Sequence, residues 1–378
     1  MARYALLSRR LLASRPCMRA ATRSFATATS STQQRASSDY RIKLVEVGPR
    51  DGLQNEKTAI PVSVKLDLID RLAKTGMTTI EAGAFVSPKW VPQMAGSSEI
   101  LEHLLQHPPT SAPNPLTYSF LVPNLKGLDS AVQVLTRYPD SFTADPLPPT
   151  QSKPAIELAV FAAATESFSR ANLNCDIATS LSRFREVIQA AKEPPKDSAS
   201  PPLRVRAYIS VVLGCPFEGY DVDPHSVARI ATALLEAGAD EIALGDTTGM
   251  GTAPRTQELL RCLASAGVRA EDLAMHFHDT YGQALVNTAV ALEHGIRTFD
   301  CSVAGLGGCP YSPGATGNVA SEDMVYFMET LGMDTGVDLD GLVDVGEWIS
   351  KEIGRGYGSV VGRAVLGARK RKEGEGKS

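Results

Sequence analysis

Two histidines separated by a single residue, His276 and His278, carry the strongest chemical signal in the sequence. They lie at the end of the apolar run Leu273–Phe277, which we predict to be a β-strand. Side chains two residues apart on a strand project to the same face, so both imidazoles can bind one metal ion. A pair of buried histidines satisfied by hydrogen bonds is the alternative. The other four histidines fall in predicted helices or loops, and this contrast favours the metal site.

Two oxygen-bearing side chains are candidates to complete the ligand set. If the chain forms a closed barrel, its first and eighth strands are neighbours, which brings Asp51 close to Asn318 at the head of the helix after the eighth strand. Two imidazoles, a carboxylate and an amide oxygen leave room for substrate or water on an octahedral ion, as a Lewis acid requires. Imidazole and carboxylate suit Mn, Fe or Zn, whereas the remaining oxygen ligands suit Mg. The ligand types therefore do not select the metal.

Three charged residues near predicted strand ends are candidates for catalysis. Arg50, on the turn after the first strand, is placed to bind a carbonyl that becomes an enolate, although a surface ion pair with Asp51 is the simpler interpretation. Glu81 and Asp246 could orient this arginine or transfer a proton. Each could equally be a helix cap or a core acid paired with Lys or Arg.

Cys309 lies in a glycine-rich run that ends at Pro310. A free cysteine is most often a small buried hydrophobic residue, which is one interpretation of this thiol. The other is a thiol on a mobile loop that covers the site and exchanges a proton with the substrate. Composition alone does not decide between them.

The elements that must position these groups are short apolar runs that alternate with helical patterns. Several runs are continuously apolar, as expected for parallel strands covered by helices on their outer face. The eight runs are Ile42–Val47, Thr79–Ala82, Thr117–Val122, Ile156–Phe161, Val205–Val212, Glu241–Leu244, Leu273–Phe277 and Thr298–Val303. Eight strands with helices between them predict an α/β fold, a (β/α)8 TIM barrel with additional C-terminal helices. An open doubly wound sheet is the alternative.

Helices between the strands are indicated by apolar residues at spacings of three and four. In Val62–Lys74 these form a stripe, and Gly76 follows where the end of a helix favours positive φ. Pro224–Ala237 and Tyr281–His294 are predicted in the same way, closed by glycines. Three stretches rich in Pro and Ser or Thr are predicted to be surface loops between a helix and the next strand. They are His107–Pro115, Tyr138–Pro154 and Glu193–Pro202.

The two ends of the chain differ in composition from the rest. Residues 1–38 contain arginines among Leu, Ala, Ser and Thr, with no acid before Asp39, which is typical of a mitochondrial transit peptide. A disordered basic tail is the alternative for this segment. We assign residues 39–362 to the catalytic barrel domain and predict residues 363–378 to be a disordered basic tail.

The overall composition points to small-molecule partners. The 378 residues are 43% apolar and 21% charged, and the net charge of -4 argues against nucleic acid as the main partner. Six cysteines without a Cys-x-x-Cys pair indicate free thiols in a reducing compartment. No apolar run reaches the roughly 18 residues that cross a bilayer, so we expect no membrane partner.

Four motifs give the chain a resemblance to the 3-hydroxy-3-methylglutaryl-CoA lyase family, over about Tyr40 to Gly362. They are Val45–Glu56, Phe85–Met94, His276–Gln283 and Ser302–Tyr311. Arg-Asp-Gly with His-x-His is shared by a wider superfamily of metal-dependent barrels of the pyruvate carboxyltransferase type. The Gly-Leu-Gly-Gly-Cys-Pro-Tyr loop is specific to the lyases.

The resemblance implies a set of roles for residues of this chain. It implies metal ligands at Asp51, His276, His278 and Asn318 for Mg2+ or Mn2+. It further implies Arg50 on the thioester carbonyl, Cys309 as a catalytic thiol, and supporting roles for Glu81 and Asp246. The family cleaves 3-hydroxy-3-methylglutaryl-CoA to acetyl-CoA and acetoacetate, in leucine breakdown and ketone-body formation in the mitochondrial matrix. A homodimer is expected from the family.

The proposed roles fit the chemistry, because cleavage beside a tertiary alcohol needs a base for the hydroxyl proton, for which His276 or Asp51 is suitable. The chain departs from some relatives at Ala82–Ala84 and at Phe277, and its last residues carry no peroxisomal tripeptide. A condensing synthase of the same superfamily is one alternative, but synthases have Glu-Arg at Gly308-Cys309. A barrel that serves only as a scaffold is another, but every proposed ligand is present.

Overall fold

The computed structural model describes residues 40–109, 112–145, 153–193, 201–308 and 316–375. Within them, eight parallel strands form a closed barrel in the order β1 to β8, and β8 pairs with β1 through Glu46↔Cys301. The strands are β1 Lys43–Glu46, β2 Thr79–Ala84, β3 Thr117–Leu121, β4 Ala155–Ala163, β5 Arg204–Ser210, β6 Glu241–Asp246, β7 Leu273–Phe277 and β8 Thr298–Cys301. The predicted TIM barrel is confirmed, and the open sheet is excluded.

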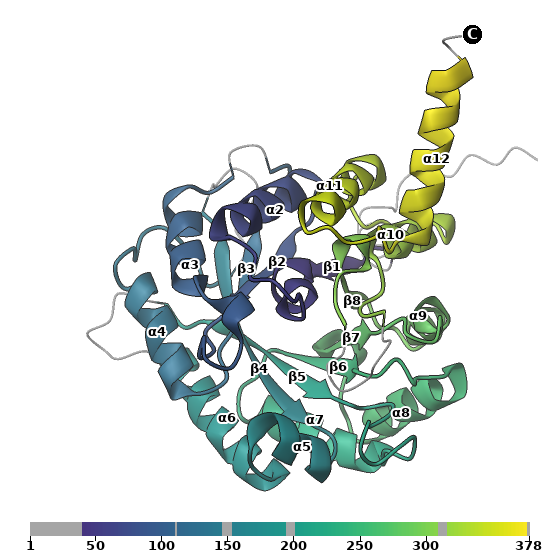
Figure 1. Cartoon of the computed structure of the whole chain (residues 1–378). Helices are drawn as coiled ribbons and strands as arrows, with labels where there is room; N and C mark the ends of the chain where they lie inside the picture. The colour runs from purple at the N-terminus through teal and green to yellow at the C-terminus, as the bar shows by residue number, and fades with distance from the viewer. Residues whose placement is uncertain (1–39, 110–111, 146–152, 194–200, 309–315, 376–378) are drawn as a thin grey trace, which may run out of the picture. The chain divides into compact units, whose positions relative to one another are not determined.

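Helices surround the barrel on its outer side (Figure 1). They are α2 Val62–Lys74, α3 Ser97–Gln106, α4 Leu125–Leu135, α5 Glu166–Leu173, α6 Ile177–Lys192, α7 Pro224–Glu236, α8 Ala253–Ser265 and α9 Ala284–Glu293. Short helical turns occur at η1 Gly48–Gly52, η2 Pro92–Met94, η3 Ala270–Asp272 and η4 Val303–Gly305. Gly76, Gly238 and Gly295 have φ of 97°, 106° and 85° just after α2, α7 and α9, as predicted for residues that end a helix.

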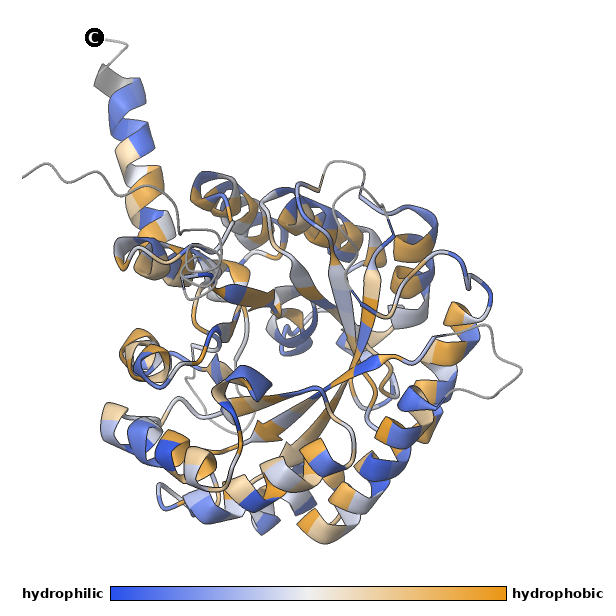
Figure 2. Cartoon of the chain, turned by 180° about the vertical axis from the view of Figure 1, so that it is seen from behind, coloured by the Kyte–Doolittle hydropathy of each residue, from blue (hydrophilic) through white to orange (hydrophobic). Residues whose placement is uncertain are grey.

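The main core lies between the outer face of the sheet and the helices. Orange apolar and blue polar residues mix along each helix in Figure 2, and the apolar stripe of α2, formed by Leu68, Ile69 and Leu72, is fully buried. The barrel interior has a separate, smaller apolar cluster. Its members are Ala84, Met94, Leu121, Ala159, Tyr208, Ala243 and Ala274. Four of the seven are alanines, which leaves room inside the barrel for charged side chains.

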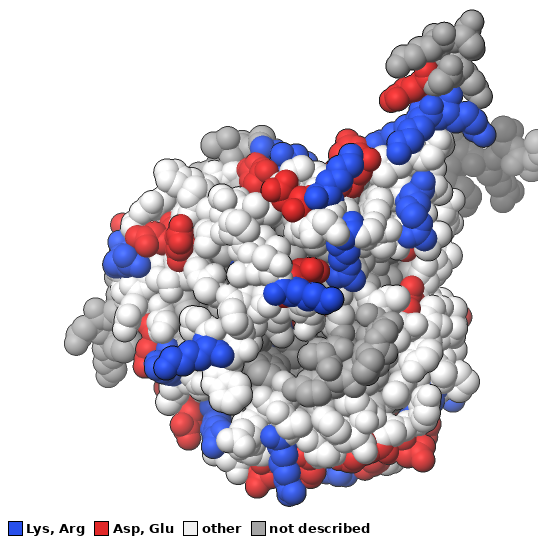
Figure 3. All heavy atoms as spheres, in the orientation of Figure 1, with Lys and Arg blue, Asp and Glu red and all other residues white. Residues whose placement is uncertain are grey.

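The Pro-rich stretches each fall between a helix and the following strand, as predicted, in so far as they are described. This places them at the opposite end of the barrel from the strand C-termini. Among the described residues, no helix combines the length and apolar character needed to cross a bilayer. Basic and acidic side chains are interspersed over the face seen in Figure 3, in keeping with the net charge of -4.

Three helices follow β8: α10 Ser321–Thr330, α11 Leu339–Glu352 and α12 Val360–Glu375. The prediction of a disordered tail from residue 363 is therefore wrong up to residue 375. Asp323 on α10 accepts hydrogen bonds from the backbone N–H of Val360 and Val361 at 3.2 and 2.8 Å, which anchors the start of α12. Arg369 pairs with Asp340 and Asp344 of α11. One of the basic residues that suggested a tail, Arg369, thus has two acidic partners that only the fold reveals.

Candidate active site

The turn after β1 carries two of the predicted site residues. η1 is a single π-helical turn, and it places Arg50 and Asp51 at the C-terminal mouth of the barrel. A Cβ on Gly48 would lie 2.6 Å from Glu46 Oε1, and one on Gly52 would lie 2.8 Å from the Leu306 Cβ. Glycine at position 52 therefore lets this turn pack against the segment after β8, whereas glycine at position 48 leaves space for the Glu46 carboxylate of β1.

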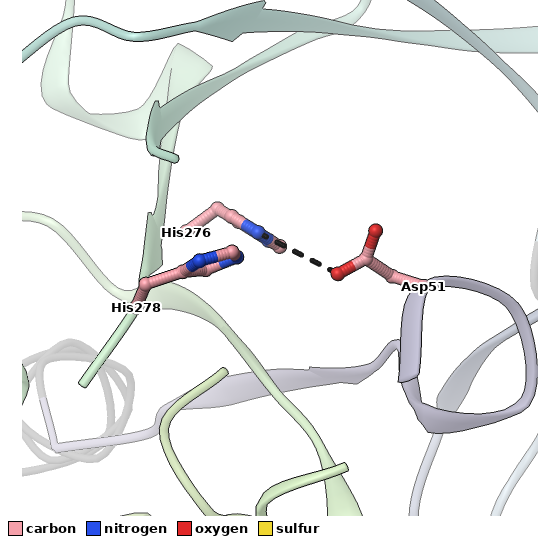
Figure 4. Close-up of side chains that lie close together, drawn as sticks. All are labelled: Asp51, His276 and His278. Atoms are coloured by element: carbon pink, nitrogen blue, oxygen red, sulfur yellow. Dashed lines mark ion pairs between the residues drawn. The ribbon is translucent and has the colours of Figure 1, made fainter. Parts of the chain in front are cut away.

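Asp51, His276 and His278 form the candidate metal centre. One ligand atom from each of them lies within 4.8 Å of the others. Figure 4 shows the carboxylate, on η1, pointing toward the two imidazoles, which come from the end of β7, two strands away from β1 around the barrel. Asp51 Oδ2 is 4.0 Å from His276 Nε2. The two imidazole rings lie 5.3 Å apart, centroid to centroid. The structure thus brings together three of the four predicted ligands at a spacing that fits one cation.

The electrostatics of these groups also fit a cation. Burial and the neighbouring His276 lower the pKa of His278 to about 4, so its imidazole is neutral at pH 7, as a ligand must be. His278 Nδ1 is buried and has no hydrogen-bond partner among the described residues. Burial alone would raise the pKa of Asp51, but Arg50, the two histidines and Asn318 lower it to about 2. The site therefore presents a charged carboxylate and a nitrogen without a partner.

Asn318 lies beside this cluster, in a bridge between its backbone and that of His278. Its Nδ2 donates hydrogen bonds to Asp51 Oδ2 at 2.8 Å and to the Leu306 carbonyl at 3.1 Å. It precedes α10 by three residues instead of heading that helix. The amide is thus fixed next to Asp51, and its role as a ligand through the oxygen remains a prediction.

Arg50 is buried against two carboxylates. Its Nη1 is 2.8 Å from Asp51 Oδ1, and its Nη2 is 2.6 Å from Glu81 Oε2. The guanidinium carbon also lies 5.7 Å from the centre of the Tyr208 ring. The surface ion pair is therefore excluded for Arg50. Glu81 is therefore a buried acid paired with an arginine, as one alternative predicted, and its role in orienting Arg50 for catalysis stays a prediction.

Asp246, at the end of β6, has a different environment. Its Oδ2 accepts a hydrogen bond from the Gly251 N–H at 3.0 Å, in the turn before α8, and its buried Oδ1 has no partner within the described part of the chain. None of the hydrogen bonds or ion pairs of the described residues joins it to Arg50. Burial raises the pKa of Asp246 to about 7, which suits proton transfer near neutral pH.

A charge network inside the barrel was not predicted from the sequence. Asp300 on β8 lies 3.0 Å from His276 Nδ1 and 2.7 Å from Arg206 Nη2. Arg206, on β5, is almost fully buried and also contacts Glu241 at 2.7 Å and the Tyr208 hydroxyl at 3.0 Å. The available signal was an ionisable residue within an apolar strand, because such a residue must point into the barrel or to a partner.

Cys309 falls in residues 309–315, outside the described part of the chain, so the structure does not test its role. The four described cysteines, Cys175, Cys215, Cys262 and Cys301, are free thiols. This agrees with the prediction made from their spacing.

Comparison with known proteins identifies the family. The model of the HMGL-like family matches residues 41–349. The chain belongs to the HMGL-like family. This match covers η1, the His-x-His pair, Asn318 and most of α11, so every predicted metal ligand lies within the family domain.

Individual members of the HMGL-like family are similar over most of their length. A 3-hydroxy-3-isohexenylglutaryl-CoA/hydroxy-methylglutaryl-CoA lyase of Pseudomonas aeruginosa is 49% identical over 326 residues, which are 86% of this chain and 97% of the relative. The mitochondrial hydroxymethylglutaryl-CoA lyase of Gallus gallus is 46% identical over 86% of this chain and 98% of the relative. The crystal structure of hydroxymethylglutaryl-CoA lyase from Pseudomonas aeruginosa superimposes with a TM-score of 0.75 at 48% identity, covering 87% of this chain and 98% of that one.

Proposed function

We propose that this protein is a metal-dependent carbon–carbon lyase that cleaves 3-hydroxy-3-methylglutaryl-CoA to acetyl-CoA and acetoacetate, in leucine breakdown and ketone-body formation. The observation that carries the proposal is the Asp51, His276 and His278 cluster with Arg50 beside it, in a chain whose relatives are named as lyases of this substrate. The Asp51 carboxylate can bind a cation, and the adjacent Arg50 guanidinium, which is always charged, can bind an anion beside it.

Asp51, His276, His278 and the Asn318 oxygen would hold a divalent cation, for which we propose Mg2+ or Mn2+. When bound, such a cation lowers the pKa of a substrate hydroxyl and fixes its geometry relative to the bond that breaks. The hydrogen bond from Asn318 Nδ2 to Leu306 holds the amide plane, so its oxygen has a fixed direction. Asp300 contacts Nδ1 of His276 and so fixes the orientation of this imidazole, whose Nε2 then points toward Asp51.

Removal of the substrate hydroxyl proton needs a base that ionises near neutral pH. Asp51, with a pKa of about 2, is too weak a base for this step. The first nitrogen of His276 is engaged by Asp300 and the second faces Asp51. We therefore assign proton acceptance to Asp246, which has a partnerless buried oxygen and a pKa of about 7.

The bond cleavage leaves negative charge on the thioester fragment. Arg50 is buried, positively charged and held on two sides by Asp51 and Glu81, so it is fixed before the charge develops. We propose that it binds the thioester carbonyl and stabilises the enolate. Cys309 would then donate a proton to the enolate carbon to form acetyl-CoA.

Location and assembly belong to the same proposal. We propose that residues 1–38 are a transit peptide that directs the protein to the mitochondrial matrix, and that the enzyme is a homodimer. The arginine-rich, acid-free segment supports the first statement, and a relative from Gallus gallus is mitochondrial while another is bacterial. Fusing residues 1–38 to a fluorescent protein tests the address, and sedimentation equilibrium of the purified chain tests the dimer.

The decisive experiment is an assay of the purified protein with 3-hydroxy-3-methylglutaryl-CoA and Mg2+ or Mn2+. We expect equal amounts of acetyl-CoA and acetoacetate, and no products after chelation. Arg50→Lys keeps the charge but loses the two-sided contact, and we expect turnover to fall by about 100-fold or more. No cleavage by the wild type would refute the proposal, and product formation only from acetyl-CoA plus a 2-oxo acid would identify a synthase instead.

A further inference from the structure

Two backbone segments pack directly against each other next to the metal centre. We call them the neck: Gly307 and Gly308 on one side, Thr316 and Gly317 on the other. A Cβ on Gly317 would lie 2.5 Å from the Gly307 carbonyl carbon and 2.7 Å from the Gly308 nitrogen. Gly317 also has φ of +94°, a conformation that disfavours other residues. The two sides of the neck therefore touch backbone to backbone, and only glycine permits this approach.

Arg355, which follows α11, binds both sides of the neck. Its Nη2 donates to the Gly307 carbonyl at 2.9 Å and to the Thr316 carbonyl at 3.4 Å. Its Nη1 pairs with Glu56 Oε1 at 3.0 Å, and Glu56 lies a few residues beyond η1. One guanidinium thus joins the two sides of the neck to Glu56, which is more than 250 residues away in the sequence. Its planar fork of donors allows this, whereas the point charge of a lysine does not.

The neck leads directly to the proposed metal ligands. Gly317 precedes Asn318, and Gly307 follows Leu306, whose carbonyl accepts the hydrogen bond from Asn318 Nδ2. The same Nδ2 donates to Asp51. On the η1 side, Asn55 Nδ2 donates to the Gly308 carbonyl at 2.9 Å. A shift of the neck would therefore move the Asn318 amide relative to the Asp51 carboxylate.

We propose that Arg355, with Glu56 as its charge partner, is a positioning residue for catalysis. It holds the two sides of the neck at a fixed separation, so that Asn318 stays beside Asp51. This inference rests on the proposed function, because it assigns Arg355 a role in the same site.

The exposure of the pair distinguishes this role from a purely structural one. The side chains of Arg355 and Glu56 are 32% and 18% exposed, and a partly solvated ion pair contributes little to global stability. Its effect is on geometry, where a displacement of about 1 Å can cost about 100-fold in rate. Removing Arg355 should therefore lower turnover much more than it lowers the melting temperature.

The test compares Arg355→Ala, Arg355→Lys and Glu56→Gln with Arg363→Ala as a matched control. Arg363 donates to the carbonyls of Tyr357 and Gly358 in the same C-terminal region but has no contact with the neck in the described structure. We expect Arg355→Ala to lower kcat by about tenfold or more, with the melting temperature within about 2 °C of wild type. Glu56→Gln should give a smaller loss, and Arg363→Ala should match the wild type.

Two further measurements address position directly. Guanidinium ion at millimolar concentration should restore part of the kcat of Arg355→Ala, and Arg355→Lys should remain impaired because one ammonium cannot serve both carbonyls. Hydrogen exchange in peptides containing Leu306–Gly308 and Thr316–Asn318 should become faster in Arg355→Ala than in Arg363→Ala. This exchange measurement does not depend on turnover.

The outcomes separate this inference from the proposed function. If the wild type cleaves the substrate and Arg355→Ala keeps its kcat, the positioning role is wrong and the lyase stands. If the wild type is inactive but exchange at the neck rises as expected, the neck contact is supported and the lyase fails. A loss of kcat matched by a large fall in melting temperature, with no rescue by guanidinium, would overturn the positioning role.

Discussion

The Asp300 carboxylate lies 3.0 Å from Nδ1 of His276, and the other nitrogen of that imidazole faces Asp51 at 4.0 Å. Asp300 on β8 and His276 on β7 are register partners in the sheet, so the pairing of these strands brings their side chains together. A carboxylate can only accept a hydrogen bond here, so it favours the tautomer that carries the proton on Nδ1 and leaves the Nε2 lone pair free for a cation. In the proposed metal centre, Asp300 would therefore orient the His276 ligand without contacting the ion.

Replacing Asp300 by Asn should weaken metal binding by about 10- to 100-fold, the usual effect of losing an outer carboxylate partner of a ligand histidine. The affinity for Mn2+ can be measured by electron paramagnetic resonance. Glu241→Gln is the matched control, because it removes the other carboxylate of Arg206 without touching His276. Both variants should be less stable to urea, but only Asp300→Asn should lose affinity. Unchanged binding in Asp300→Asn would show that this carboxylate does not orient the ligand.

Mn2+ should raise the melting temperature of the wild type by several degrees, because a ligand at about 100 times its Kd adds about 2.7 kcal/mol to the free energy of unfolding. EDTA should reverse the increase. His278→Ala removes one ligand of the cluster and should abolish it. His294→Ala, at the end of α9, should respond as the wild type does. A full response in His278→Ala would move the metal centre elsewhere.

Asp246→Asn should lower turnover by about 100-fold or more, since a positioned general base contributes that much or more to a rate. Its affinity for Mn2+ should stay close to that of the wild type, because no hydrogen bond or ion pair among the described residues joins Asp246 to the cluster. Steady-state rates and metal titrations measured on the same preparation provide the comparison. Turnover near the wild-type value would require another base.

Cys309→Ser should lower turnover by at least about tenfold, a modest expectation for the loss of one general acid. Metal affinity should be almost unchanged. Cys262→Ser, on the outer helix α8, is the control for the loss of a thiol. An equal loss of metal binding in Cys309→Ser would mean that this thiol acts on the metal centre instead of on the substrate.

The stability of the fold should decrease as the pH rises toward 8. Burial raises the pKa of Glu322 to about 8, although the Ala304 N–H and the Tyr357 hydroxyl hydrogen-bond to its carboxyl group. The folded state thus holds a proton that the unfolded chain releases near its ordinary pKa of 4.5. The contribution of the protonated Glu322 to the free energy of unfolding is complete below about pH 4.5. It decreases by up to about 1.4 kcal/mol per pH unit as the pH rises to 8.

Glu322→Gln mimics the protonated side chain, so the free energy of unfolding of this variant should fall less as the pH rises. Urea unfolding at pH 5.5 and pH 8 provides the measurement, with Glu329→Gln, exposed on the same helix, as the control. If Glu322→Gln and wild type lose the same free energy between these pH values, Glu322 does not hold a proton in the folded state.

Properties set within one element were predictable from the sequence. α2 and β7 have the predicted limits because their apolar residues follow the repeat of a helix and the register of a buried strand. His276 and His278 lie close together for the same local reason. Asp51 and Asn318, 267 residues apart, were placed together through the closure of a barrel, which is a rule of the fold.

Other features depended on which distant residues meet. Arg206 and Asp300 are 94 residues apart, and their contact follows from the stagger of β5 to β8 around the interior. Arg355 and Glu56 are 299 residues apart, and they meet only because α11 packs beside the barrel. The segment predicted to be a tail forms α12, and Arg369 on this helix pairs with Asp340 and Asp344 of α11.

The sequence by itself therefore determined the barrel, the approximate position of each strand and the chemical groups available near the strand ends. The exact ends were less predictable, since β5 and β8 end at Ser210 and Cys301 instead of Val212 and Val303. The tertiary structure decided which of these groups form ion pairs, which side chain orients another, and which backbone segments pack against each other. The physical reason is range: a helical or strand repeat acts over a few residues, whereas strand register and helix docking result from many weak contacts summed over the whole chain.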